Sequence, residues 1–126
     1  MKKFPLKTAL LALTLISIPA LSSAADEFEE GFLAAELGNY DKAMKKLGPL
    51  AESGHMDAQF NIALLYHNGS ITGQVDEKQA LRWYEMAAKN GHYIAQEYLA
   101  VAYREGWFGL KPNSKKAKYW EKKLKP

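Results

Sequence analysis

The sequence predicts an all-α fold, an α/α solenoid of about three helix pairs, on two observations. The segments 46–69 and 83–106 share residues at a constant offset of 37 positions. Within both segments the apolar residues recur with the 3.6-residue period of a helix, and no strand pattern competes. A repeat of this length is typical of a solenoid, in which each helix pair buries its apolar face only against its neighbours.

The repeated positions carry three kinds of residue, and each kind has a structural role. Glycines end helices, alanines let neighbouring helices approach closely, and aromatic rings fill the space between pairs. We expect these roles at Gly54, Ala58, Ala63, Tyr66 and Gly69 in one copy, at Trp83, Gly91, Ala95, Ala100, Tyr103 and Gly106 in the next, and at Trp120 in a partial third copy.

Glycines also mark where the helices end. Each of five glycines follows an apolar-periodic segment, as a C-terminal cap does: Gly38, Gly54, Gly69, Gly91 and Gly106. The pattern predicts six helices, at approximately 26–37, 40–53, 57–68, 76–89, 93–105 and 113–124. Asp76 and Asn113 stand 37 residues apart, and each can accept a backbone N–H as the N-cap of its helix.

Residues 1–24 have the order of regions found in a secretory signal peptide. Residues 1–7 include three lysines, residues 8–21 are mostly apolar, and small residues follow before Asp26. We expect cleavage after Ala24 or Ala25, which leaves residues 25–126 as one repeat domain in the periplasm or outside the cell. The apolar run is too short to span a bilayer comfortably, so no stable membrane insertion is expected after cleavage. The chain has no cysteine, so no disulfide stabilises it.

Charge is distributed unevenly along the chain. The formal net charge of +3 comes from the three leader lysines. Residues 26–60 have eight acids and three lysines, whereas residues 61–126 have six acids and eleven lysines and arginines. We therefore expect a stack that is acidic at its first helices and basic at its last. The basic end is either a solvated helix with lysines on its outer face or a docking surface for an acidic partner or anionic headgroups.

The polar residues form no catalytic or metal-binding motif. His55 and His92 follow helix-ending glycines at equivalent positions, where a role in the turn explains them, and His67 is isolated. The sequence has no HExxH, CxxC or GxSxG motif and no glycine-rich phosphate loop. We therefore predict no catalytic residue, no metal site and no cofactor, and a partner that is a protein or peptide and not a nucleic acid.

The repeat resembles a known family. Residues 58–69 and 95–106 share the pattern AQxx(I/L)AxxYxxG and resemble the first helix of Sel1-like repeats. Residues 78–91, KQALRWYEMAAKNG, look like the family's second helix, and residues 37–54 are similar to the TPR-like unit that often precedes such repeats. The resemblance implies an α/α superhelix that serves as an adaptor for other proteins and has no catalytic residue.

A partner-binding face follows if the first helix of each pair lines the concave side, as in the related TPR geometry. The residues opposite the packing positions would then face inward: Phe28, Phe32, Phe60, Leu64, His67, Glu97, Val101 and Arg104. An apolar stripe of this kind is a candidate surface for a partner helix or peptide. The alternative is that Phe28, Phe32 and Phe60 pack the first two helix pairs together.

The connections before the fourth and sixth helices hold further apolar residues. Ile71 and Phe108 occupy equivalent positions and are expected to pack under their loops. Trp107 has Ser70 as its counterpart, and it is either an exposed contact or a cover for the last helix.

The leading functional hypothesis is an exported scaffold for protein–protein interaction without chemistry of its own. A narrower version is an immunity-type protein that neutralises a periplasmic effector. The competing classes are a cell-wall-related enzyme, which would need a pocket of converging polar groups, and a purely structural oligomer joined through the ends of the stack.

Overall fold

The computed structural model describes residues 22–126, and the signal peptide expected at residues 1–24 lies outside this part of the chain except for its last three residues. The described chain has six helices: α1 (Ala24–Glu36), α2 (Tyr40–Glu52), α3 (Met56–His67), α4 (Glu77–Lys89), α5 (Tyr93–Glu105) and α6 (Ser114–Leu124). Every bound lies within two residues of the one expected from sequence. The all-α prediction is therefore confirmed for these residues.

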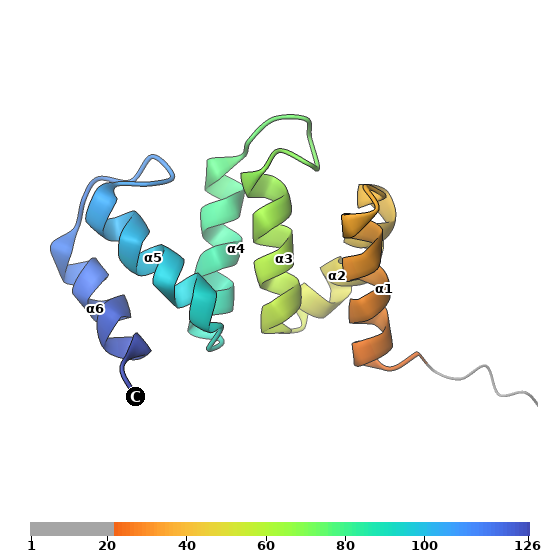
Figure 1. Cartoon of the computed structure of the whole chain (residues 1–126), viewed down its shortest axis with the longest axis horizontal. Helices are drawn as coiled ribbons and strands as arrows, with labels where there is room; N and C mark the ends of the chain where they lie inside the picture. The colour runs from red at the N-terminus through yellow and green to blue at the C-terminus, as the bar shows by residue number, and fades with distance from the viewer. Residues whose placement is uncertain (1–21) are drawn as a thin grey trace, which may run out of the picture.

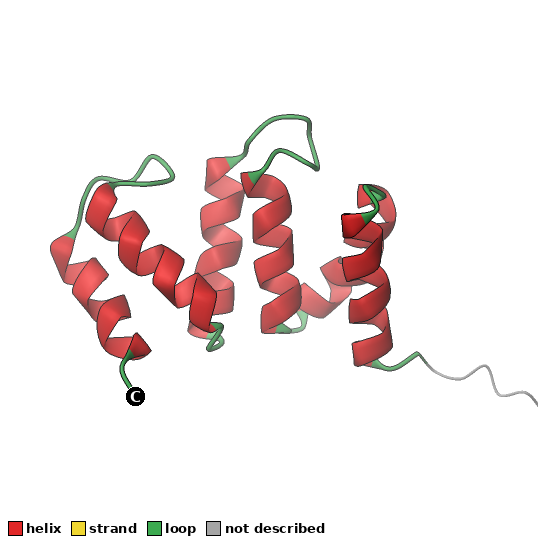
Figure 2. Ribbon diagram, in the orientation of Figure 1, coloured by secondary structure: helices red, strands yellow, loops and turns green. Residues whose placement is uncertain are grey.

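The helices stack in chain order as three antiparallel pairs. Figure 1 shows α1 at one end of the stack and α6 at the other. The two long loops, residues 68–76 and 106–113, lie at the same edge (Figure 2). Judged over residues 22–126, none of the helices has the length and hydrophobicity needed to cross a bilayer.

The helix ends form as the sequence predicts. Asp76 and Asn113 accept hydrogen bonds from the N–H groups of Gln79 and Lys116, each at 3.0 Å. All five expected helix-ending glycines have a positive φ. At Gly69 space is limiting too, since a Cβ would lie only 2.9 Å from the carbonyl carbon of Gln74. Each loop therefore leaves its helix in one defined direction.

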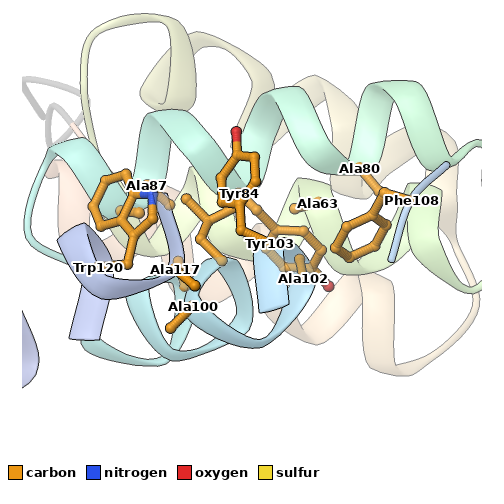
Figure 3. Packing of buried hydrophobic residues seen from close by; sticks show 13 residues of the cluster. Ala63, Ala80, Tyr84, Ala87, Ala100, Ala102, Tyr103, Phe108, Ala117 and Trp120 are labelled. Carbon is orange, nitrogen blue, oxygen red and sulfur yellow. The ribbon is translucent and has the colours of Figure 1, made fainter. Parts of the chain in front are cut away.

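The buried residues form two clusters along the stack. One lies among α1, α2 and α3 and includes Leu47 and Ile62. The other joins α3 to α6, and Figure 3 shows rings of Tyr84, Tyr103 and Phe108 packed among its alanines. The side chains of Tyr66 and Trp83 are partly buried against both clusters. The repeated alanines Ala58, Ala63, Ala95 and Ala100 are buried, as expected.

Equivalent glutamines tie each helix pair to the next. Gln59 donates a hydrogen bond from Nε2 to the carbonyl oxygen of Ala51 at 2.8 Å, and Gln96 repeats this contact with Ala88 at 3.0 Å. Asn90, which follows α4, adds a bond within the pair α3–α4, because its Nδ2 donates to Gln59 Oε1 at 2.9 Å. The constant offset of 37 residues therefore repeats a specific polar contact as well as the apolar packing.

The first two helices approach each other through a glycine. A Cβ at Gly31 would lie 2.7 Å from Leu47 Cγ and 3.0 Å from Lys46 Cβ. Leu47 is fully buried under this glycine and is the counterpart of Tyr84 in the next repeat. The opening unit therefore reaches the same packing with smaller residues than its successor.

Candidate partner-binding site

The residues predicted for the concave face lie on α1, α3 and α5. On α1 the rings of Phe28 and Phe32 stack at 6.2 Å between centroids, and Phe28 also stacks on His55 at 5.1 Å. Phe28 is half-buried, whereas Phe32 is exposed. The two phenylalanines therefore lie together, and Phe28 also covers His55 in the turn before α3.

Phe60 takes part in packing between repeats. Its ring stacks on His92 with the centroids 4.1 Å apart and contacts the rings of Tyr84 and Tyr98 at 5.7 and 5.9 Å. The side chain is half-buried as a result. Phe60 is therefore a packing residue, but it packs the second helix pair against the third and not the first two pairs together, as the alternative expected.

The remaining predicted residues divide between two places. Leu64 and His67 line one hollow near the end of α3. On α5, Val101 is half-buried, and Glu97 and Arg104 are exposed. Arg104 forms an ion pair with Glu121 of α6. Of the eight residues, Leu64 and His67 are thus the two that the structure places together at an open cavity.

His55 and His92 are helix N-caps, as their position in the turn predicts. Nδ1 of His55 accepts a hydrogen bond from the N–H of Ala58, and Nδ1 of His92 accepts one from Ala95, each at 3.2 Å. This geometry requires an unprotonated Nδ1. Among residues 22–126 no three His, Asp or Glu side chains gather closely enough to hold a metal ion.

The His92 cap should make stability depend on pH. Burial lowers the pKa of His92 below its usual 6.5, although Asp57 lies 3.5 Å from Nε2 and opposes the shift. A lowered folded-state pKa stabilises the fold above pH 6.5, and this contribution is lost as the pH falls through the folded-state value. We expect urea unfolding to show a loss of about 0.5–2 kcal/mol on acidification, the usual worth of an N-cap. His92→Asn keeps a cap that does not titrate, so it should flatten this part of the pH profile; an unchanged profile would contradict the assignment.

Three adjoining hollows lie along the edge that holds the two long loops. The first, of about 360 Å³, is lined by His67, Glu77, Gly106, Trp107, Phe108 and Gly109. The second, of about 230 Å³, shares His67 with it and is lined also by Leu64 and Asn68. The third, of about 560 Å³, shares Glu77 and Phe108 with the first and follows residues 72–78. We call Leu64, His67, Glu77, Trp107 and Phe108 the loop-edge surface.

The loop of residues 106–113 holds Trp107 outward and Phe108 inward. Trp107 is 44% exposed, whereas Phe108 is buried against the rings of His67 and Tyr84. Phe108 has φ +57°, a left-handed conformation that is rare for a bulky residue and recurs at functional sites. Backbone bonds fix the loop, among them Trp107 N–H to Ala102 at 3.0 Å. The exposed indole is therefore held in place and not on a free tip.

Buried tyrosines support the loop-edge surface from below. The Tyr84 hydroxyl is hydrogen-bonded to His67 Nδ1 at 3.0 Å, and burial raises the pKa of Tyr84 well above its usual value. Burial, together with a hydrogen bond to Glu85, raises the pKa of Tyr103 to about 12. Both phenols therefore stay neutral at physiological pH and hold α4 against α3 and α5.

Sequence reasoning missed Glu77 and left Trp107 without a definite place. A Cβ at Gly109 would lie 3.9 Å from Glu77 Oε2, which shows how closely the second loop passes the start of α4. The repeat offered no signal for this meeting, because Trp107 corresponds to Ser70. Ile71 and Phe108, in contrast, pack under their loops as predicted.

The second and third helix pairs match a known protein family. The family model described as Sel1 repeat matches residues 57–92 and 94–123, which correspond to the pairs α3–α4 and α5–α6. Comparisons with the curated proteins and with the solved structures gave no match. The two family matches together cover more than half of the chain. The chain therefore belongs to the Sel1 repeat family, whose repeats generally mediate interactions between proteins.

Proposed function

We propose that this Sel1 repeat protein is an exported interaction scaffold that binds a segment of another protein on the loop-edge surface. The observation that carries the proposal is the row of adjoining hollows with the exposed ring of Trp107 at its centre. Tryptophan is enriched among the few residues that supply most of the binding energy of protein interfaces. Because backbone hydrogen bonds hold the loop that carries the indole, a partner can bind there without the entropy loss of ordering a flexible loop.

The chemistry of the surface selects the kind of partner segment. Leu64 and Trp107 offer apolar area, the buried Phe108 lines the hollow beside Trp107, and the exposed carboxylate of Glu77 lies in the same hollow as the indole. No ion pair within residues 22–126 involves Glu77. A segment that places an apolar side chain against Trp107 and a lysine or arginine beside Glu77 would complement both features.

This proposal shifts the binding face predicted from sequence toward the loops. Leu64 and His67 remain part of it, while Phe60 supports the packing beneath. Export rests on the signal-peptide pattern of residues 1–24, which also places the partner in the periplasm or outside the cell.

Site-specific photo-crosslinking tests the proposal. A photoreactive phenylalanine analogue replaces Trp107 in one variant and Tyr93 in a control, because Tyr93 is 55% exposed on α5 and lines none of the three hollows. We expect a discrete protein adduct at position 107, recovered in the fraction released by osmotic shock, and none at position 93. With the partner identified, Trp107→Ala should weaken binding by about 2 kcal/mol or more and Tyr93→Ala by little.

Each outcome of this experiment has a defined meaning. Equal adducts at both positions, or no adduct at position 107, would overturn the loop-edge assignment. Adducts found only in the cytoplasm would overturn export. An effector protein as the captured partner would identify the immunity-type version of the function.

A further inference from the structure

The first end of the helix stack presents an apolar residue among acids. Leu33 is 57% exposed on the face of α1 opposite the buried Gly31 and Ala34. Asp26, Glu29 and Glu36 lie on the same outer face by helical spacing and are exposed. The two acids nearest α2 do not belong to this outer face. Glu27 and Glu30 form ion pairs with Lys46.

The other end of the helix stack also presents an apolar residue, and here the surrounding charges are positive. Tyr119 is 54% exposed on the face of α6 opposite the buried Ala117 and Trp120. Lys122 and Lys123 line a cavity of about 330 Å³ beside its ring, and Lys123 Nζ lies 5.5 Å from the ring centroid. The same outer face also carries Lys115 and Lys118, both exposed.

We propose that copies of this chain associate head to tail, with the basic outer face of α6 on one copy docking against the acidic outer face of α1 on the next. The charges decide the geometry, because α1 against α1 or α6 against α6 would set like charges opposite each other. The two faces cannot meet within one copy, since they lie at opposite ends of the stack (Figure 1). Contact of unlike faces gives a linear chain of copies or a closed ring.

Repeat stacking provides the physical basis for this contact. Within residues 22–126 the middle helix pair packs against a pair on each side, whereas the first and the last pair each pack against one. The contact would cover Leu33 and Tyr119 and set lysines against carboxylates around them. It uses none of the residues of the loop-edge surface, so a partner protein could bind to each copy in the assembly.

Light scattering and sedimentation velocity of the purified chain test this inference. At low ionic strength the mean mass should rise with protein concentration to at least double that of one copy. At about 1 M salt, where charges are screened over a few ångströms, it should return to that of one copy. A chain that stays monomeric at low salt up to its solubility limit overturns the proposal.

Charge reversal gives the decisive comparison. The pair Glu29→Lys and Glu36→Lys reverses the net charge of the α1 face, and the pair Lys118→Glu and Lys122→Glu removes the net positive charge of the α6 face; all four residues are exposed. Each variant alone should be monomeric, and an equimolar mixture should associate again, because the unchanged α6 of the first variant can dock against the unchanged α1 of the second. Lys78→Glu with Lys89→Glu on α4 makes the same change in net charge as the α6 pair, and this control should still associate. Association of either the α1 or the α6 variant alone, or a mixture that stays monomeric, overturns the proposal.

Discussion

Replacing Tyr84 with alanine is expected to lower the free energy of unfolding by about 3–5 kcal/mol, which is a large part of the stability of a domain of this size. Tyr84 is fully buried and touches the rings of Phe60, Tyr98 and Phe108 at 5.3–5.7 Å. These rings come from α3, α5 and the loop before α6. The cavity left by alanine would therefore loosen three elements at once. Urea denaturation followed by far-UV circular dichroism measures the change.

Tyr84→Phe separates ring packing from the hydroxyl group. It keeps the ring and removes the hydrogen bond to His67 Nδ1, so we expect a loss of only about 0.5–1.5 kcal/mol. Equal effects of alanine and phenylalanine would show that the hydroxyl, and not the ring, holds the second cluster together.

Replacing Gln59 with leucine is expected to cost about 1–3 kcal/mol, because it leaves hydrogen-bonding groups without a partner in a buried place. Gln59 is 1% exposed and joins Ala51 of the preceding helix pair to Asn90 at the end of its own pair. Leucine has nearly the same size, so the change removes the polar link with little change in packed volume. Chemical denaturation of the purified variant provides the value.

The equivalent change at Gln96 is the matched control. Gln96 makes the same bond to Ala88 but is only half-buried. We therefore expect Gln96→Leu to cost less than Gln59→Leu. The reverse order would mean that the additional bond between Gln59 and Asn90 contributes little to stability.

The fold could be predicted because the residues that end helices and the 37-residue repeat indicate the same architecture. Helix-ending glycines such as Gly54 and Gly91 have a positive φ, and the alanines 37 residues apart are buried. These features depend on backbone conformation and side-chain size, which are read directly from residue type. The helical period then places each apolar face toward its neighbour without knowledge of the final packing.

The candidate site could be predicted only in part. Leu64 and His67 followed from their positions on the first helix of a pair. The meeting of Glu77 with Trp107 depends on how two loops fold against each other, and Phe108 adopts φ +57° without the glycine that usually signals this conformation. Phe60 was placed on the correct helix face, but its stacking on His92 depends on the distance between repeats.

Circular dichroism of residues 93–126 produced alone, beside the full chain, tests the central claim that each helix pair is stable only on its neighbour. In the full chain α5 packs against α4 and α6 packs against α5, and buried residues of all three helices, Tyr84 of α4 among them, form one cluster. The isolated pair lacks α4, so we expect little helix and no cooperative thermal transition, whereas the full chain should unfold cooperatively. A fragment with native-like helix content and a sharp transition of its own would contradict the account.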